Sequence, residues 1–574
     1  MGKILPDNTG RPETKMKQIS DNIRKNRNLY NMKFRNILSL VLAILLSGSI
    51  FGQSKNFRLG QWVEINNAII KELDRSYVDS LPLGRIERKA INAMLENLDP
   101  YTVYIPEEDK EDLQMMINKT YGGIGAIIFK PEKDGYVFIN EPYLNSPAVR
   151  GGLHSGDRIV EIDGVPTKGL ETKECSDRMK GKPGTIVKFK VLKVHTGEEK
   201  EISIKRERIH FPDVEYAGML DDTTGYILQT GFTENVSGDI RAAYNKLKPR
   251  GMKRLFLDLR GNGGGLMHEA INIVSLFVPK GSLVVSQKGR KDAEKKEYRT
   301  VIEPIDTEIP LFVLVDGGSA SSSEIVAGAL QDLDRATIIG KRTYGKGLVQ
   351  SIVPLPYNGQ MKVTTAKYYT PSGRCVQAID YENRNEDGSV GYIADSLTKE
   401  FKTLHGRTVR DGGGITPDIE IDAPQYSRLV YSLVLNGIIE QYALDFVSRH
   451  ESIPAIDDFH FEDFEDFVNF AKDKKFDYRS SAKALYDQMK AELKKDGLED
   501  RLENQLAEID KVIMIEKEDF LRMKKDEILP WIEEEIAVRY YYQEAGVKVR
   551  LRYDEQLKKA LQAKSAVYSN MPVA

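Results

Sequence analysis

Four of the five residues at positions 319–323 are serines, and they directly precede a stretch with helical periodicity. The apolar run LFVLV before them predicts a strand, so the cluster occupies a strand-to-helix turn. Ser319, Ser322 and Ser323 are candidates for helix caps, and Glu324 in the first turn would support the helix dipole. A serine nucleophile in this turn would also gain from the helix amides as negative charge develops on the reacting group. The cluster therefore leaves room for one catalytic serine among structural ones.

A serine nucleophile needs a base, and the sequence offers a lysine more readily than a histidine. His268 follows a glycine-rich segment, but no histidine lies near the serine turn in sequence. Lys346 stands between two glycines and between two runs that predict strands. A lysine acts as a base only where a tight apolar setting lowers its pKa. We expect that setting for Lys346, whereas Lys341 and Lys362 are expected to be more exposed.

The segment GKRTYGK at residues 340–346 also satisfies the G-x-x-x-x-G-K pattern of a phosphate-binding loop. Gly347 occupies the position of the Ser or Thr that would hold magnesium. The following LVQSIVPL alternates like a strand instead of opening the helix that such a loop requires. These two departures disfavour a nucleotide hydrolase.

A second glycine-rich loop follows the run RLFLDL, which predicts a buried strand. Its residues 261–265, GNGGG, form a loop whose backbone can approach a substrate closely. As a dinucleotide-binding fingerprint the segment fails, because Leu266 occupies the third glycine position. Asp258, Arg260 and Asp332 are expected to orient this loop and the serine helix rather than to react with a substrate.

The composition fits a globular protein, because 574 residues suffice for about three or four domains. The formal net charge is only −3, from 83 basic and 86 acidic residues, so nothing favours nucleic acid as a partner. Cys175 and Cys375 are too few for a disulfide scaffold or a cysteine-built metal site, and we expect free thiols. The seven histidines show no metal-binding spacing, which argues against a zinc enzyme.

The N-terminal region predicts export. MKFRNILSLVLAILLSGSIFGQ, residues 32–53, has a short basic start, an apolar run and small residues at its end, as signal peptides do. The polar residues 1–31 are expected to be a non-native extension or a disordered tail, with the true start at Met32. The alternative is an uncleaved membrane anchor. Both interpretations place the chain from about residue 54 outside the cytoplasm, in the periplasm or cell envelope.

Periodicity divides the remaining chain into four parts. Apolar residues at three- and four-residue spacing predict a helical segment over 54–118. Short alternating runs separated by Gly, Pro and Asp predict a β-rich module over 119–208. Strands followed by helical patterns predict an α/β domain over 209–424. A charged helical region follows over 425–574, and the helical spacing of four of its aromatic residues predicts a core-facing stripe: Phe461, Phe464, Phe467 and Phe470.

The β-rich module resembles a PDZ domain. The resemblance rests on YGGIGAII and on SPAVRGGLHSGDRIVEIDGVPTKGL at the distance expected for that fold. It implies that a peptide's terminal carboxylate binds backbone amides of the loop while the peptide adds as a strand. The loop residues concerned are Gly123, Ile124, Gly125 and Ala126.

A larger combination of motifs resembles the carboxyl-terminal processing (tail-specific) serine peptidases over approximately residues 60–422. It comprises GGSASSSEIVAGALQDLDRATIIGKRTYGKGLVQ, the preceding LDLRGNGGG, the PDZ-like module, and the later TPSGR and GGITPDIEI. The resemblance implies Ser321 as nucleophile, Lys346 as base and Gln350 as the residue that orients the lysine. The spacing of four residues would put Lys346 and Gln350 on the same side of one strand. The polar residues 380–411 exceed the shortest family members and are expected to be a surface elaboration.

The same resemblance implies a multidomain α/β protein: a helical N-terminal segment, a PDZ domain, a serine peptidase core like crotonase and ClpP, and a helical C-terminal domain. The implied oxyanion hole combines an amide of Gly263 or Gly264 with that of Ser322. No metal or organic cofactor is needed. The implied partners are exported proteins or peptides with free C-termini, which the PDZ domain delivers or uses to gate the site, and a second copy of the chain bound through terminal helices. The alternative, a catalytically inactive PDZ scaffold, leaves the joint presence of Ser321, Lys346 and Gln350 unexplained.

Overall fold

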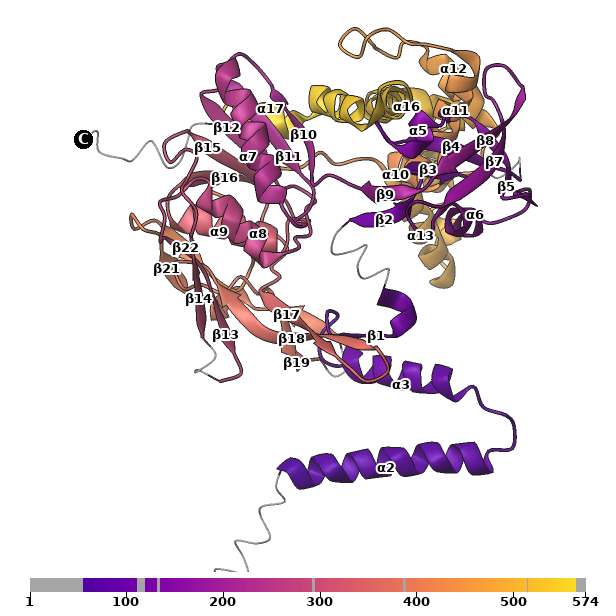
Figure 1. Cartoon of the computed structure of the whole chain (residues 1–574). Coiled ribbons are helices and arrows are strands. Elements are labelled where there is room, and N and C mark those ends of the chain that lie inside the picture. Colours follow the sequence, from indigo (N-terminus) through magenta and orange to yellow (C-terminus); the bar gives the residue numbers. More distant parts are fainter. Residues whose placement is uncertain are drawn as a thin grey trace, which may run out of the picture. The chain divides into compact units, whose positions relative to one another are not determined.

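The computed structural model describes residues 55–110, 119–131, 135–291, 295–385, 389–513 and 515–563. The expected signal peptide over 32–53 and the polar residues 1–31 lie outside these ranges. The chain forms two compact units, Met1–Ala93 and Met94–Ala574, whose elements are labelled in Figure 1. Within the described ranges, no helix combines the length and the apolar character that crossing a membrane requires.

The predicted helical segment contains two long helices, α2 (Lys55–Ser76) and α3 (Leu83–Glu96). On α2, the apolar side chains of Trp62 and Val63 are exposed. The expected helices are interrupted at LDPYTVYIP, residues 98–106, and the structure has a short strand there, β1 (Val103–Ile105), in the second unit. Pairing with a neighbouring strand stabilises this short segment.

The β-rich module is an antiparallel sheet in the order β3-β4-β5-β7-β8, with β6 paired to β5. Alternate residues of β7 are buried, as a sheet with one covered face requires. β3 forms one edge, so its outer backbone groups are available for pairing. The elements are β2 (Thr120–Gly123), β3 (Ala126–Phe129), β4 (Val137–Pro142), α5 (Pro147–Arg150), β5 (Arg158–Ile162), β6 (Val165–Pro166), α6 (Thr172–Met179), β7 (Ile186–Leu192), β8 (Glu199–Lys205) and β9 (Glu207–His210).

The α/β domain is built on a six-stranded sheet in the order β10-β11-β12-β15-β16-β23. All neighbours are parallel except β10 and β11. The loops after β12 and β15 therefore leave the same edge of the sheet, which brings the glycine-rich loop and the serine turn together. The elements are β10 (Val214–Met219), β11 (Thr224–Gln229), α7 (Val236–Leu247), β12 (Arg254–Asp258), α8 (Met267–Ser275), β15 (Leu311–Val315), α9 (Ser322–Asp332), β16 (Ala336–Gly340) and β23 (Ile419–Glu420).

Helices cover both faces of this sheet. Side chains of alternate strand positions such as Leu257 and Val313 share a core with α7, α8 and α9, which lie in front of the sheet in Figure 1. The other positions, such as Phe256 and Phe312, pack against α17 (Glu555–Leu561) near the C-terminus. Every residue of α9 is buried, although the sequence predicted a single apolar face. The helix that begins at the serine cluster is thus enclosed on all sides and held rigidly.

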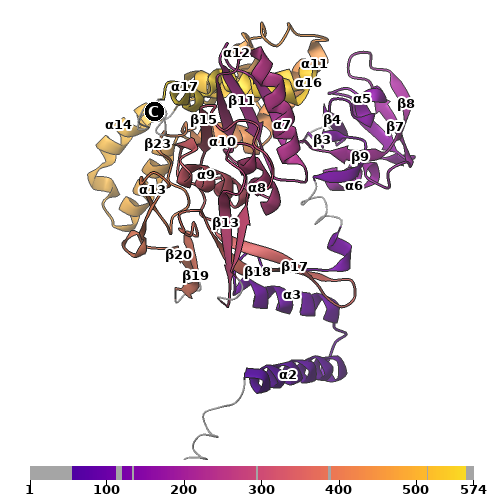
Figure 2. The same ribbon diagram turned by 60° about the vertical axis from the view of Figure 1, so that its left-hand side comes forward.

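A second, antiparallel sheet completes this part of the chain. Strand β17 (Leu348–Pro354) pairs with β18 (Gln360–Tyr369), and the two run as a long hairpin in Figure 2. On its other side β18 pairs with β1 and with β13 (Leu283–Gly289), which pairs with β14 (Lys296–Arg299). The polar residues after β18 form two small hairpins, β19 (Ile379–Arg384) with β20 (Val390–Tyr392) and β21 (Glu400–Lys402) with β22 (Thr408–Arg410).

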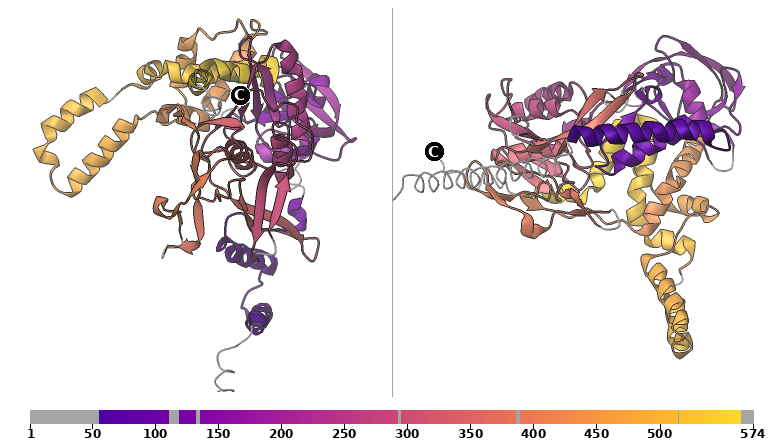
Figure 3. Two further views of the ribbon diagram at one scale, coloured as in Figure 1. Left: turned by 90° about the vertical axis from the view of Figure 1, so that its left-hand side faces the viewer. Right: turned by 90° about the horizontal axis from the view of Figure 1, so that it is seen from below.

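The C-terminal region is helical, as predicted. Phe461, Phe464 and Phe467 are buried in a core of their own, and Phe470 packs against it, which confirms the core-facing stripe. The amber helices α13 and α14 lie antiparallel in Figure 3, and the Tyr486 hydroxyl joins them by donating to the Leu506 carbonyl at 2.7 Å. The helices are α10 (Arg428–Leu435), α11 (Ile438–Arg449), α12 (Phe464–Lys472), α13 (Ser481–Lys495), α14 (Glu503–Ile513), α15 (Lys517–Met523), α16 (Lys525–Tyr553) and α17.

Candidate active site

Ser321 stands apart from the other serines by its backbone conformation. It is the N-cap of α9, with φ 57° and ψ −112°, a region that residues with side chains rarely adopt. Two hydrogen bonds hold it there. Its amide donates to Glu324 Oε2 at 2.8 Å, and the Tyr368 hydroxyl donates to its carbonyl at 3.1 Å. Such strain persists only where the surroundings enforce it, which is common at reactive positions.

The other three serines of the cluster fasten the helix to the neighbouring glycine-rich loop. The prediction that they cap the helix is therefore wrong, because the N-cap is Ser321 and their hydroxyls point elsewhere. Each hydroxyl donates to a backbone carbonyl at 2.7–2.9 Å: Ser319 to Leu259, Ser322 to Gly265 and Ser323 to Asn262. The serine run thus joins the serine turn to the glycine-rich loop through hydrogen bonds, and the strained Ser321 lies between the serines that form them.

Gly264 touches the strained serine directly. A Cβ added at this residue would lie 2.8 Å from Ser321 Cβ and 2.9 Å from Ser322 N, and its φ is +95°. Both conditions demand glycine. The Gly264 amide donates to Asn262 Oδ1 at 2.9 Å, whereas a Cβ on Gly263 would meet nothing within 4 Å. The loop and the helix start therefore come together as predicted for the oxyanion hole, with the Gly264 amide already engaged by a side chain.

Glu324 joins the serine turn to the lysine loop. Its carboxylate is fully buried and accepts four hydrogen bonds at 2.6–2.8 Å, from the amides of Ser321, Gly345 and Lys346 and from the Thr343 hydroxyl. Burial raises the pKa of Glu324, and these donors oppose that shift. The sequence predicted only a helix-dipole role for this residue. The S-x-x-E capping-box spacing could have revealed one of the four bonds, but not the three that cross to the lysine loop.

Lys346 has the environment that a base requires. Its Nζ lies 4.1 Å from the centroid of the Tyr101 ring. Burial and the charge of Lys362 lower the pKa of Lys346 to about 8, against the opposing effect of the carboxylates of Glu324 and Asp99. At pH 8 about half of the molecules would thus carry a neutral lysine, against a vanishing fraction for an ordinary one.

Gln350 lies near Lys346, but for a different reason than the sequence suggested. Lys346 precedes β17, and the pairing of β17 with β18 shifts between Val349 and Gln350, so even spacing along one strand does not apply. In the described part of the chain, the hydrogen bond of the Gln350 amide runs to Thr364 Oγ1 at 3.2 Å. Lys362, which the sequence expected to be more exposed than Lys346, is half-buried and lines the same cavity.

One cavity of about 480 Å³ brings the predicted residues together. Ser321, Ser322, Lys346 and Gln350 line it, with Gly263 and Gly264 at the same wall. The size suits a few residues of an extended peptide, and apolar side chains make up much of its surface. Those side chains are Phe232, Met267, Ile325, Leu348 and Ile352.

Competing chemistries find little support in the geometry. The side chain of His268 is 59 % exposed and lies 3.6 Å from Glu269, and it is not among the residues that line this cavity. A strand follows Lys346, as predicted, and not the helix of a phosphate-binding loop. Across the described ranges, no cluster of His, Cys, Asp and Glu side chains could hold a metal ion. Cys175 and Cys375 are both free thiols, as expected.

The acidic residues near the two loops form buried ion pairs. Asp258 accepts a hydrogen bond from the Tyr226 hydroxyl at 2.7 Å and pairs with Arg260, which also pairs with Asp554 near α17. Asp332, at the end of α9, pairs with the buried Arg374 at 2.8 Å. These contacts anchor the strand before the glycine-rich loop and the far end of the serine helix.

The PDZ-like loop connects β2 to the edge strand β3. Gly125 has φ +76°, and a Cβ there would lie 2.6 Å from Ser146 Cβ, so the turn requires glycine. The carbonyls of Ile124 and Gly125 accept from Ala148 and Tyr143, which fixes the loop against the module. Burial raises the pKa of Tyr121, and the nearby Gly125 amide opposes this shift. The Tyr121 hydroxyl thus lies near one amide of the predicted carboxylate site, a proximity that the sequence did not predict.

Comparison with known proteins assigns three segments to families. A PDZ domain matches residues 113–192, the peptidase family S41 matches 223–383, and a domain described as "Probable PDZ-protease, C-terminal helical domain" matches 429–563.

Similar proteins include two that are named carboxy-terminal processing proteases. A carboxy-terminal-processing protease of Bartonella bacilliformis is 36 % identical over 315 residues, which cover 54 % of this chain and 71 % of the relative. The carboxy-terminal processing protease CtpA of Bacillus subtilis is 32 % identical over 414 residues, which cover 71 % of this chain and 85 % of the relative. Among solved structures, the photosystem II D1 C-terminal processing protease is 26 % identical, with a TM-score of 0.33 over 62 % of this chain and 91 % of that one.

Proposed function

Because the chain belongs to the family of carboxy-terminal processing proteases, which are serine-type peptidases, we propose that it cleaves peptide bonds with a Ser321–Lys346 dyad. The observation that supports this most strongly is the shared cavity: Ser321, held in a strained N-cap, lines it together with a lysine whose pKa burial lowers to about 8. A neutral amine beside a serine hydroxyl is what nucleophilic attack without histidine requires.

The reaction follows from these positions. Lys346 Nζ takes the proton of the Ser321 hydroxyl as Oγ attacks the scissile carbonyl. Amides of Gly263 or Gly264 and of Ser322 stabilise the oxyanion. The ammonium of Lys346 then protonates the leaving amine, and the acyl-enzyme remains. Water attacks the ester and gives a proton to Lys346, which passes it to the departing Ser321 Oγ as the new carboxyl terminus is released. Gln350 orients the lysine between these steps.

The PDZ domain would supply substrate recognition. Its loop Gly123, Ile124, Gly125 and Ala126 offers backbone amides to a terminal carboxylate, and the free edge of β3 offers pairing to the residues before it. The substrates are exported proteins, since residues 32–53 have the pattern of a signal peptide.

Cleavage of an unfolded protein with a free C-terminus tests the proposal. The purified chain is incubated with this substrate beside two variants, Ser321→Ala and the control Ser480→Ala, whose hydroxyl caps α13. We expect cleavage by the wild type and the control and none by Ser321→Ala. Cleavage by Ser321→Ala at the wild-type rate would contradict the role of Ser321 as nucleophile. If all three proteins bind peptide but none cleaves the substrate, the result would favour a PDZ scaffold.

A further inference from the structure

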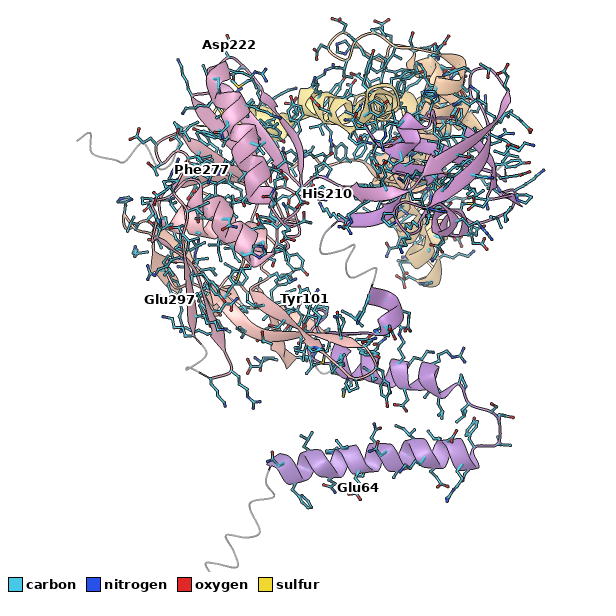
Figure 4. All side chains as sticks on the ribbon, in the orientation of Figure 1. Glu64, Tyr101, His210, Asp222, Phe277 and Glu297 are labelled. Atoms are coloured by element: carbon cyan, nitrogen blue, oxygen red, sulfur yellow. The ribbon has the colours of Figure 1, made fainter. Side chains whose placement is uncertain are left out.

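A turn far from the motifs reaches the proposed base. Residues 98–102, LDPYT, lie between α3 and β1, and Figure 4 labels Tyr101 beside the β17–β18 hairpin. The ring of Tyr101 faces the Lys346 ammonium, with Nζ 4.1 Å from its centroid. No part of the mechanism given above uses this residue.

The turn is built to hold that ring in place. Asp99 Oδ1 accepts from the amides of Tyr101 and Thr102 at 2.9 and 2.8 Å, and Asp99 Oδ2 accepts from the Thr102 hydroxyl at 3.1 Å. Asp99 and Thr102 are both buried. The Tyr381 ring packs edge-on against the Tyr101 ring with centroids 6.2 Å apart, and burial raises the pKa of Tyr101 far above its usual range, so the hydroxyl stays protonated. Tyr101 is therefore held at its backbone and at its ring.

The same turn is also connected, through Thr364, to Gln350, the residue proposed to orient the lysine. The Thr364 amide donates to Thr102 Oγ1 at 3.2 Å, and Gln350 Nε2 donates to Thr364 Oγ1 at 3.2 Å. The pairing of Val103 with Lys362 fixes the next residue of the chain against β18. One turn thus reaches Lys346 through a ring and Gln350 through two hydroxyls.

Two opposing effects act on an ammonium under an aromatic ring. The negative face of the ring attracts the cation, which favours the charged lysine. The ring also excludes water, which disfavours it. The charged groups that act on Lys346 are Lys362 on β18, Glu324 on α9 and Asp99 in the turn, and the two carboxylates favour the ammonium. Burial is the largest cause of the lowered pKa of Lys346, and it exceeds the opposing effect of the two carboxylates.

We propose that Tyr101 is a positioning residue for the general base: its ring packs over the Lys346 ammonium and keeps water from it, while Thr102 fixes Gln350 through Thr364. This inference rests on the proposed role of Lys346. It assigns to the LDPYT turn a function in catalysis that its sequence, a loop between a helix and a strand, does not suggest.

The pH dependence of turnover tests the inference. Turnover of an unfolded substrate is measured from pH 6 to pH 10 for the wild type, Tyr101→Phe, Tyr101→Ala and the control Tyr104→Ala, which removes a ring near Gly359 from the same segment. We expect Tyr101→Ala to move the acidic midpoint upward by about one pH unit, because water reaches the ammonium. Turnover at pH 7 then falls about tenfold and recovers near pH 10. Tyr101→Phe and Tyr104→Ala keep the wild-type midpoint.

The outcomes separate this inference from the proposed function. An unchanged midpoint in Tyr101→Ala, with Lys346→Arg inactive, overturns the role of Tyr101 and leaves the dyad intact. An active Lys346→Arg overturns the dyad itself. Because loss of the ring also removes packing, the thermal midpoint of each variant is measured. If Tyr101→Ala is unfolded at 25 °C, Tyr101→Gln replaces it. Glutamine keeps most of the side-chain volume but lets water reach the Lys346 ammonium, so this variant must show the same upward shift of the acidic midpoint.

Discussion

At the scale of single residues, Glu324 explains how the serine turn and the loop that contains Lys346 are held in contact. Its carboxylate binds the amide of Ser321 on one side and the amides of Gly345 and Lys346 on the other. The proposed nucleophile and the proposed base are therefore fixed to the same carboxylate. A carboxylate is suited to this task because it accepts about four hydrogen bonds, twice the number that a single oxygen can accept.

Replacement of Glu324 by alanine tests this arrangement. The change leaves three buried amides and a hydroxyl without their acceptor, at a cost of about 1–3 kcal/mol for each one that stays unsatisfied. We expect a decrease of at least about 3 kcal/mol in the free energy of unfolding, measured by urea titration, and loss of turnover. Glu303→Ala is the matched control, since its carboxylate is 77 % exposed and should change stability by less than about 0.5 kcal/mol. Equal stability of both variants would show that Glu324 does not hold the loops.

Residue types and spacings indicated Lys346 as a candidate base and a catalytic serine among the four of the cluster, and the family resemblance then implied Ser321. Glu324 and Tyr101 could not be assigned in this way. Their partners lie on other elements, and a carboxylate in a first helical turn or a tyrosine in a turn has an ordinary local explanation. The prediction that Lys346 and Gln350 share one face of a strand was wrong. A local shift in strand pairing before Gln350 changes which side chains point to the same face.

At the scale of elements, the site depends on close contact between the glycine-rich loop and the start of α9. Gly264→Ala should destroy this contact. The added Cβ would lie 2.7 Å from the Ala320 carbonyl oxygen and 2.8 Å from Ser321 Cβ, and the backbone stands at φ +95°. We expect a loss of turnover of at least about 100-fold, because the clash displaces the loop and the helix start and so misplaces an oxyanion donor.

A second glycine provides the control for this experiment. A Cβ at Gly317, in the same turn as the serines, would meet nothing within 4 Å, so Gly317→Ala should keep turnover within about twofold. Steady-state turnover and thermal unfolding are measured for both variants. Wild-type turnover in Gly264→Ala would refute the requirement for contact between loop and helix.

Most strands and helices follow from local patterns, but the second sheet does not. Alternating residues predicted β4, β5, β7 and β8, and buried apolar runs predicted β11, β12, β15 and β16, as the structure confirms. β1 has only three residues, and its partner β18 lies more than 250 positions later in the chain. A pairing of this kind is set by tertiary packing, for which a short triplet contains no local signal.

At the scale of the whole molecule, peptide recognition and cleavage belong to different domains of one chain. The PDZ match covers residues 113–192 and the peptidase match covers 223–383. If backbone amides of Gly123–Ala126 hold a terminal carboxylate, blocking that group should weaken binding without altering the peptide otherwise. The Ser321→Ala chain allows the measurement without cleavage.

Isothermal titration of that variant with two peptides tests recognition. The peptides share a sequence, and one carries a free carboxylate and the other a C-terminal amide. Charge-assisted hydrogen bonds contribute about 1.5–3 kcal/mol, so the amide should bind at least about tenfold more weakly. Gly125→Ala, which would bring a Cβ to 2.6 Å from Ser146 Cβ, should weaken binding of the free acid. Equal affinity for both peptides would exclude carboxylate recognition by the loop.

The most direct measurement of the central claim is turnover of an unfolded substrate by Lys346→Arg between pH 6 and pH 10. Burial lowers the pKa of Lys346 to about 8, and only the neutral amine accepts a proton, so wild-type turnover should rise through about pH 8 and level off above it. Arginine keeps its proton throughout this range, and the variant should show no turnover at any pH. Gln350→Ala should lose less, and His268→Ala should match the wild type. Robust turnover by Lys346→Arg, with a midpoint in the imidazole range of about 6 to 7, would contradict the dyad and point to a histidine base.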